Sequence, residues 1–407
     1  MAAAVSRGAN FMRTAPDWRF LATLGSVTLL GPLAIHAFLP AMPAVKAVFA
    51  INDAVAGLTF SITLLVMAFA TLIYGSLSDR YGRRPVLLAG LALFVLGSGL
   101  SGLAASITGF IAGRMLQALG AGCSVTLARA IARDAYGTEG LVKVIAYLTM
   151  AYALGPMISP FFGGLLVDSV GWRGVFWFAV VCGALIGWAS WRILGETHPS
   201  EARESKPAGY VRDYVRLFSH ARFCGFVLQS GFSSGCFYTM AAASTFLMKD
   251  YLGRSATEFG SYFVLFPAGY FLGNLVSSRI SHRFSIESMV VAGSVINFVA
   301  VSSQSISVLI GHVTPLVLFV PGFFLTFGQG ISLPNATTGS MRVIPTLSGT
   351  ASGVGAFFQA FLGALLTELY SILSDGTPMP MVQVVWTSSF LMLAMGMIPL
   401  LLKKGAS

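Results

Sequence analysis

A short charged segment lies between two long apolar runs, and this arrangement restricts the chain to few kinds of fold. The runs at residues 55–74 and 86–104 are each long enough to cross a hydrocarbon layer of about 30 Å as a helix. The segment between them, residues 75–85, reads GSLSDRYGRRP. Because Lys and Arg accumulate in short cytoplasmic loops, the segment is predicted to be a tight cytoplasmic connection between two membrane-spanning helices.

Similar apolar runs recur along the whole chain. Hydrophobic residues make up 56% of the sequence and the mean hydropathy is +0.79, which excludes a soluble domain. The pattern predicts an all-α membrane protein with twelve transmembrane helices in two six-helix bundles. The predicted divisions are an N-terminal arm (1–19), a first bundle (20–195), a cytoplasmic linker (196–222), a second bundle (223–402) and a tail (403–407).

The distribution of charge gives an orientation. A net charge of +10 is common in proteins that bind nucleic acids, but most of the 25 Lys and Arg residues fall in connections on one predicted face. The other face holds Lys46, Arg173, Lys249 and Arg254. The positive-inside rule then predicts a multi-pass protein of a bacterial inner membrane with both termini in the cytoplasm. Contacts with anionic lipid explain most of these charges, and no nucleic-acid partner is expected.

Several kinds of chemistry lack the residues that they need. The four cysteines have no C-x-x-C spacing, so no metal site is expected, and no cofactor is implied. A Walker-type phosphate loop is absent, which argues against ATP as the energy source. A membrane enzyme would need a clustered nucleophile, a metal site or an acid–base pair, and none is evident. The chain is therefore predicted not to be an enzyme.

Several stretches resemble one family. The pattern G-x-L-x-D-R-x-G-R-R at residues 75–84 is similar to the signature of the major facilitator superfamily. Within that superfamily, residues 39–43 (LPAMP), 128–134 (ARAIARD), 195–197 (GET) and 349–352 (GTAS) resemble the Bcr/CflA-like branch of the drug:proton antiporter group. This resemblance implies the major facilitator fold and proton-driven export of small drugs or metabolites.

The resemblance also implies roles for particular residues. Asp79 would cap the N-terminus of the helix predicted at residues 349–373, a carboxylate at the positive end of a helix dipole. Arg83 would pair with Asp134 and latch the outward-facing state. The predicted conformational latch comprises Gly75, Asp79, Arg80, Gly82, Arg83 and Asp134. The helix predicted at residues 141–167 carries an antiporter-like motif and further small residues, which weaken it and allow close helix packing: Gly155, Pro156, Gly163 and Gly164.

One departure from the branch concerns proton coupling. The branch usually carries an aspartate in an I-D-x-Y-L-P pattern, whereas this chain reads Ile35-His36-Ala37-Phe38-Leu39-Pro40. Ionisable residues at membrane depth are generally functional, and three are candidates for proton coupling: His36, Arg114 and Glu368. Histidine ordinarily titrates near pH 6.5, so His36 could replace the missing carboxylate. The alternative is a neutral histidine that bonds a facing helix.

Other polar and aromatic residues in the predicted spans could line a substrate cavity near the midplane. Each could equally be a packing residue, because polar side chains in membranes also bond neighbouring helices. The candidates are Gln117, Tyr147, Tyr152, Gln229, Phe232, Tyr238, Tyr262, Phe266, Asn335 and Gln359.

The leading functional hypothesis is a monomeric secondary transporter that exports a small drug or metabolite in exchange for protons. The alternative is a facilitator or importer of a small organic anion, such as a siderophore or an organic acid. Arg114 and the missing carboxylate favour that alternative.

Overall fold

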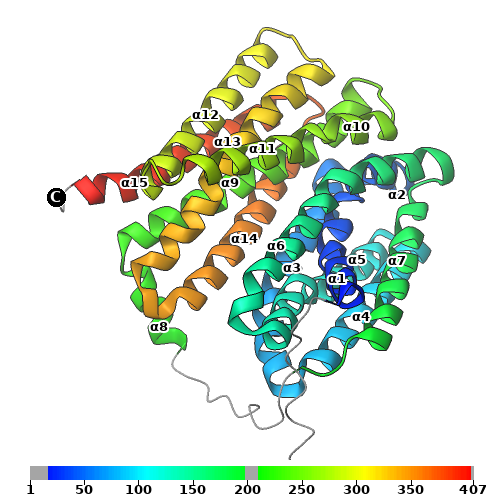
Figure 1. The fold of residues 1–407 in the computed structure, drawn as a ribbon. Helices are drawn as coiled ribbons and strands as arrows, with labels where there is room; N and C mark the ends of the chain where they lie inside the picture. Colours follow the sequence, from blue (N-terminus) through cyan, green and yellow to red (C-terminus); the bar gives the residue numbers. More distant parts are fainter. Residues whose placement is uncertain (1–16, 198–209, 405–407) are drawn as a thin grey trace, which may run out of the picture. The chain divides into compact units, whose positions relative to one another are not determined.

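The computed structural model describes residues 17–197 and 210–404, and within these ranges the regular structure is entirely helical (Figure 1). This confirms the predicted all-α class. Residues 37–38 form a turn between the first two helices. In the first half the helices are α1 (Trp18–His36), η2 (Leu39–Ala41), α2 (Met42–Phe49), α3 (Asp53–Tyr81), α4 (Arg83–Leu103), α5 (Ile107–Ala121), α6 (Cys123–Val170) and α7 (Arg173–Ile193).

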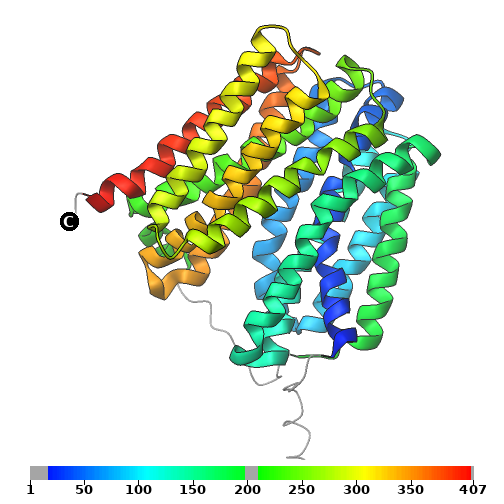
Figure 2. The same ribbon diagram turned by 45° about the horizontal axis from the view of Figure 1, so that its top comes forward.

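The second half continues the same pattern of long helices joined by short connections. Its helices are α8 (Tyr210–Phe218), α9 (Ala221–Phe246), η4 (Leu247–Tyr251), α10 (Ala256–Phe263), α11 (Leu265–Ile280), α12 (Ile286–Leu309), α13 (Pro315–Val343), η5 (Pro345–Leu347), α14 (Ser348–Leu373) and α15 (Met379–Lys404). Helix α13 packs against α11 and α12, and the three run side by side in Figures 1 and 2.

Eleven helical segments among the described residues are long and apolar enough to cross a membrane. Helix α9 is not one of these, although the sequence predicts a span there. Its 26 residues include Gln229 and several serines, which interrupt its apolar pattern. At 1.5 Å per residue it is still about 39 Å long, enough to cross a bilayer. Helices α14 and α15 pack against it, so its polar groups are shielded from lipid.

The chain forms two compact units that do not coincide with its two sequence halves. Within the described residues, unit 1 comprises residues 17–36, 69–156 and 173–197. Unit 2 comprises residues 37–68, 157–172 and 210–404. Unit 2 therefore includes three pieces of the first half: η2 with α2, the beginning of α3 and the end of α6. The predicted division into two bundles at residues 196–222 stays a prediction.

The structure corrects the predicted connection at residues 75–85. Helix α3 continues to Tyr81 and α4 begins at Arg83, so only Gly82 lies outside a helix. Gly82 has φ 99° and ψ 152°, a backbone conformation that is almost restricted to glycine. The segment remains helical because no residue between Gly75 and Tyr81 forces a break. The signature is thus mainly the last turns of α3 followed by a one-residue turn.

Two further boundaries differ from the prediction. The first apolar run of the first bundle, residues 20–39, predicts a helix that ends at Leu39, before Pro40, but α1 ends at His36. Pro40 and Pro43 instead occupy the first turns of η2 and α2, where a missing N–H group is harmless. Helix α6 runs without interruption for 48 residues, from Cys123 to Val170, so it begins well before the helix predicted at residues 141–167.

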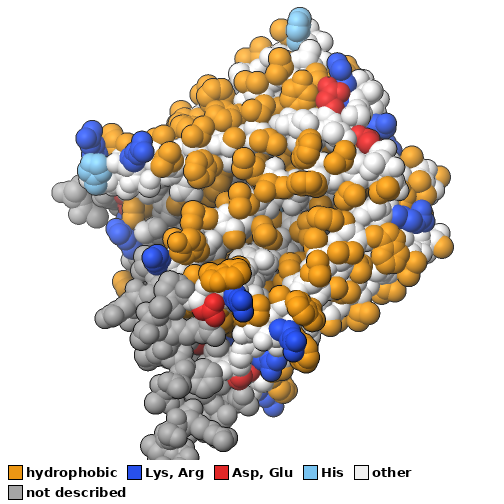
Figure 3. Space-filling model, turned by 45° about the vertical axis from the view of Figure 1, so that its right-hand side comes forward, with side chains coloured by type: hydrophobic (Ala, Val, Ile, Leu, Met, Phe, Trp, Pro, Cys, Tyr) orange, Lys and Arg blue, Asp and Glu red, His pale blue; other side chains and the backbone are white. Residues whose placement is uncertain are grey.

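The exposed side chains suit a lipid environment. Large apolar residues such as Leu185, Trp188, Phe271 and Val299 are exposed on the helices. Figure 3 shows apolar side chains over much of the visible face, whereas most Lys and Arg side chains lie toward its margins. This pattern is expected of helices that span a bilayer.

The backbone at Gly82 makes a direct prediction. Gly82→Ala should lower the thermal unfolding temperature in detergent, because its conformation costs a side chain about 1–3 kcal/mol. Gly75→Ala is the matched control: Gly75 is helical, a Cβ there would meet nothing within 4 Å, and alanine favours helix. Equal unfolding temperatures for the two variants would contradict this description of the turn.

Candidate functional site

Arg83 is the centre of a polar cluster at one end of unit 1. The residue is only 5% exposed, and its guanidinium makes three side-chain contacts. Its Nε lies 2.9 Å from Asp134 Oδ2 on α6, and one terminal nitrogen lies 2.6 Å from Asp79 Oδ1. The same nitrogen donates to Ser78 Oγ at 2.6 Å. The ion pair with Asp134 that the family resemblance implied is therefore present, while its role as a latch stays a prediction.

Glu196 completes this group, which we call the Arg83 cluster: Ser78, Asp79, Arg83, Asp134 and Glu196. The Glu196 carboxylate accepts hydrogen bonds from the backbone N–H groups of Arg83 (2.9 Å) and Arg84 (3.2 Å). These groups lie in the first turn of α4, where backbone N–H groups have no helical partner and a negative charge is favourable. Sequence reasoning assigned no role to Glu196, although the GET stretch that contains it was part of the family resemblance.

The other predicted latch residues lie beside this cluster. The guanidinium of Arg80 lies over the ring of Tyr81, with its central carbon 5.3 Å from the ring centroid. Gly75 lies in α3, in open surroundings. Asp79 binds Arg83 within unit 1, and its predicted cap of α14 stays a prediction.

Arg114 is fully buried in unit 1 and bonds neighbouring helices. One terminal nitrogen donates to Ala34 O of α1 at 3.0 Å and to Gln117 Oε1 at 2.5 Å. Gln117 in turn donates to Ser98 Oγ of α4 at 2.9 Å. The guanidinium also lies 5.8 Å from the centroid of the Phe176 ring on α7. These contacts link four helices, so they favour a packing role for Arg114 and Gln117.

His36 is the last residue of α1 and is only 3% exposed. Arg114 bonds the backbone of Ala34, two residues earlier, and so reaches the same final turn of α1. The chain also passes from unit 1 into unit 2 directly after His36. His36 is therefore both the end of a helix and the last residue before the chain enters unit 2.

Glu368, the third candidate, belongs to unit 2. It lies on α14 and accepts a hydrogen bond of 2.6 Å from Ser61 Oγ on α3. This bond joins a helix of the first sequence half to a helix of the second. His36 and Arg114 belong to unit 1, so the three candidates are divided between the units.

Further polar contacts in unit 2 join the two sequence halves near the predicted outer face. Lys46 Nζ on α2 lies 2.5 Å from Asp53 Oδ1 and 3.0 Å from Asp250 Oδ2. Ser374 Oγ donates to Asp53 Oδ2 at 2.8 Å. We call Lys46, Asp53, Asp250 and Ser374 the outer cluster. Sequence reasoning placed Lys46 on the outer face but gave it no partner, because Lys46 and Asp250 are 204 positions apart.

The end of α6 is attached to the second half as well. Asp168 Oδ2 accepts hydrogen bonds from Thr257 N at 2.8 Å and from Thr257 Oγ1 at 2.6 Å. Gly163 and Gly164 allow close packing here. A Cβ on Gly163 would clash with the backbone of Ala37, and one on Gly164 with the backbone of Ala256.

The other two small residues of α6 lie in unit 1. A side chain at Gly155 would overlap Pro32 of α1, so this glycine permits α6 and α1 to approach closely. Pro156 is the last residue of unit 1 in α6, and Met157 belongs to unit 2. The motif therefore lies where α6 passes from one unit to the other.

The predicted substrate-cavity residues differ in their surroundings. Gln229 donates to Ser294 Oγ at 3.1 Å, and Asn335 to Ser277 Oγ at 2.9 Å. Phe266 is buried, with its ring 5.3 Å from that of Phe319. Such surroundings favour packing roles for these three. The remaining candidates are exposed in unit 1 (Tyr147 and Tyr152) or partly exposed in unit 2 (Phe232, Tyr238, Tyr262 and Gln359), and a cavity lined by them stays a prediction.

Relatives of known name cover most of the chain. Multidrug resistance protein D of Escherichia coli (strain K12) is 28% identical over 364 residues, which are 89% of this chain and 91% of the relative. A bicyclomycin resistance protein homolog of Haemophilus influenzae is 24% identical over the same shares. These two relatives confirm the resemblance to the Bcr/CflA-like branch.

The solved structures agree on the fold. The crystal structure of a D-xylose-proton symporter superposes with a TM-score of 0.76 at 12% identity, covering 92% of this chain and 97% of the symporter. The predicted two-bundle transporter fold is thereby confirmed. Residues 24–367 match the profile of the Major Facilitator Superfamily. The chain is a multi-pass membrane transporter that belongs to the Major Facilitator Superfamily.

Proposed function

We propose that this protein exports a small drug or metabolite across a bacterial inner membrane in exchange for protons, as a monomer with both termini in the cytoplasm. The observation that carries the proposal is similarity over 89% of the chain to Multidrug resistance protein D. The Arg83 cluster supports it, because the signature residues make specific contacts rather than forming a generic charged turn.

The grouping of helices into units supports a mechanism for the export cycle. Three pieces of the first half, residues 37–49, 53–68 and 157–172, pack with the second half in unit 2. The outer cluster and the Asp168–Thr257 bonds attach these pieces there. We infer that these contacts close the outer side, and that they separate when the outer side opens. A transporter needs such a two-state element, because substrate and proton can only shift an equilibrium that already exists.

Gly155 and Pro156 are suited to absorb part of that change. Proline and glycine weaken a helix locally, and the motif lies at the passage of α6 between the units. Gly155 also keeps α6 close to α1, because a side chain there would overlap Pro32. Bending at this point would let the end of α6 move while its beginning stays in unit 1.

Two groups remain as proton carriers in this proposal. His36 occupies the position of the branch carboxylate at the end of α1. Glu368 is an ionisable group on α14, and it accepts the Ser61 bond that joins α14 to α3. Arg114 is a weaker candidate, since its guanidinium bonds Ala34 and Gln117. Those bonds also reduce the support for the organic-anion alternative, which relied on Arg114.

The proposed direction of transport can be tested in cells and in inside-out vesicles. Expression in a drug-hypersensitive strain should raise the inhibitory concentration of at least one compound from a panel of bicyclomycin-, chloramphenicol- and sulfonamide-like drugs. Vesicles should accumulate that compound, and a protonophore should abolish the accumulation. Faster uptake by intact cells than by an empty-vector control would indicate import and contradict the proposal.

The proton carrier can be identified by comparing two variants in liposomes, each of which replaces an ionisable side chain by a neutral amide. We expect His36→Gln to lose accumulation driven by a pH gradient but to keep downhill exchange, and His36→Asp to regain part of the accumulation. Glu368→Gln should accumulate substrate normally, because an amide oxygen can still accept the Ser61 bond. If Glu368→Gln loses accumulation and His36→Gln keeps it, Glu368 carries the proton and the assignment to His36 is wrong.

The Arg83 cluster predicts a defect in turnover rather than in binding. Asp79→Asn removes a charge that pairs with Arg83, so it should shift the conformational equilibrium and slow transport several-fold. Substrate affinity measured by calorimetry should survive. Asp375→Asn is the matched control, because Asp375 is an exposed carboxylate that bonds Thr377 locally. A normal transport rate in Asp79→Asn would remove the argument for a latch.

A further inference from the structure

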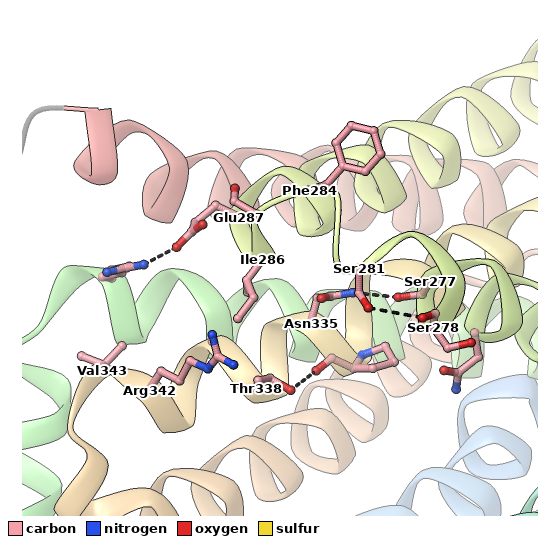
Figure 4. Close-up of a pocket in the computed structure, with 15 residues that line it drawn as sticks. Ser277, Ser278, Ser281, Phe284, Ile286, Glu287, Asn335, Thr338, Arg342 and Val343 are labelled. Atoms are coloured by element: carbon pink, nitrogen blue, oxygen red, sulfur yellow. Dashed lines mark hydrogen bonds and ion pairs between the residues drawn. The ribbon is translucent and has the colours of Figure 1, made fainter. Parts of the chain in front are cut away.

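A hollow of about 650 Å³ lies in unit 2, among the ends of four helices of the second half (Figure 4). Arg222 from α9 and Glu287 from α12 lie at one end of it, and α11 and α13 supply most of the rest. Its volume falls within the range of small-molecule sites. The conformational mechanism proposed above uses none of these residues.

The lining of this hollow is unusually polar for so apolar a chain. It includes four serines, one threonine and two asparagines. Hydroxyl and amide groups of this kind can donate hydrogen bonds to an oxyanion. Two pairs of these residues already bond each other: Asn335 donates to Ser277 Oγ at 2.9 Å, and Ser281 Oγ donates to Ser278 O at 3.3 Å. The walls are thus held in place by their own bonds.

The lining also carries an excess positive charge. Arg222 forms an ion pair with Glu287, so these two charges compensate each other. Arg342 on α13 is exposed, and no acidic residue in the described part of the chain lies within ion-pair distance of it. Figure 4 shows its guanidinium extending from α13 on the side of Ile286. The net charge of the three ionised side chains is one positive unit.

The hollow differs from the end of unit 1 that carries the Arg83 cluster in how its charged side chains are paired. The junction of α11 and α12 occupies the place in the second half that Gly82 and its neighbours occupy in the first. In unit 1, Arg83 is paired with the acid Asp134 on α6. In the second half the charges are exchanged: α12, which follows the junction, carries Glu287 in its first turn, and α13 carries Arg342 in its last turn. Glu287 pairs with Arg222 instead, which leaves Arg342 available to a ligand.

The surroundings identify the chemistry of that ligand. Phe284 lines the hollow and is 55% exposed, so a ligand with an apolar part could lie against it. The hollow is at the predicted cytoplasmic face, where the leaflet carries anionic lipids. Arginine binds phosphate oxygens with strong charge-assisted hydrogen bonds. We propose that this hollow binds a phosphate group, carried by the headgroup of an anionic phospholipid or by a soluble phosphate.

The test uses purified full-length protein in nanodiscs. Phosphatidylglycerol titrated into phosphatidylcholine discs should bind and raise the thermal unfolding temperature. Arg342→Gln should weaken this binding about tenfold, the effect expected when one charge-assisted hydrogen-bonding group is removed. Arg342→Lys should keep part of it. Size-exclusion chromatography checks that each variant is folded.

Arg279→Gln is the matched control, because Arg279 is also exposed in the same part of unit 2 but does not line the hollow. It should bind phosphatidylglycerol like the unmodified protein. A second arm adds inorganic phosphate to protein in discs of phosphatidylcholine alone. Stabilisation that Arg342→Gln abolishes in that arm would support the site and identify soluble phosphate as the source. Equal losses in Arg342→Gln and Arg279→Gln, or no response in either arm, would overturn the proposal.

Discussion

The burial of the Arg83 guanidinium is the interaction on which the end of unit 1 depends. A cation that is withdrawn from water is costly unless charges and hydrogen bonds compensate it. Asp79, Asp134 and Ser78 supply that compensation, and they come from α3 and α6. Glu196 binds the backbone at the same point, so the segment after α7 is attached too. One residue thus ties together elements that are distant in sequence, which explains why the signature is so dense in charge.

The outer contacts act on the same helices at their other ends. Helices α3 and α6 each belong to unit 1 at one end and to unit 2 at the other. The Arg83 cluster holds them in unit 1, while Asp53 and Asp168 attach them to second-half elements in unit 2. These outer contacts are ion pairs and hydrogen bonds, which suit the separation that we propose for this surface. Extensive apolar packing in place of these contacts would stabilise the closed outer side so strongly that it would seldom open.

Much of the fold could be predicted from the sequence, because apolar runs of membrane length and basic connections are local patterns. The boundaries were harder. Gly82 alone forms the turn between α3 and α4, because no residue before it breaks α3. The end of α1 at His36 was hard to predict, because Pro40 and Pro43 lie in the first turns of the next two helices and do not mark where α1 stops. The site was predicted only in part. The Arg83–Asp134 pair followed from family resemblance, whereas the contacts of Lys46 with Asp250 and of Ser61 with Glu368 join residues 204 and 307 positions apart. No local pattern encodes such pairs.

The central claim is that the outer pieces of the first half leave their second-half partners during transport. Spin labels at Val48 on α2 and Tyr251 on η4, both exposed, would measure this separation by double electron–electron resonance after replacement of the four native cysteines. The account predicts a short and a long distance population, with the short one reduced by Lys46→Gln, because Lys46 bridges to Asp250. A single distance that Lys46→Gln and substrate leave unchanged would contradict it.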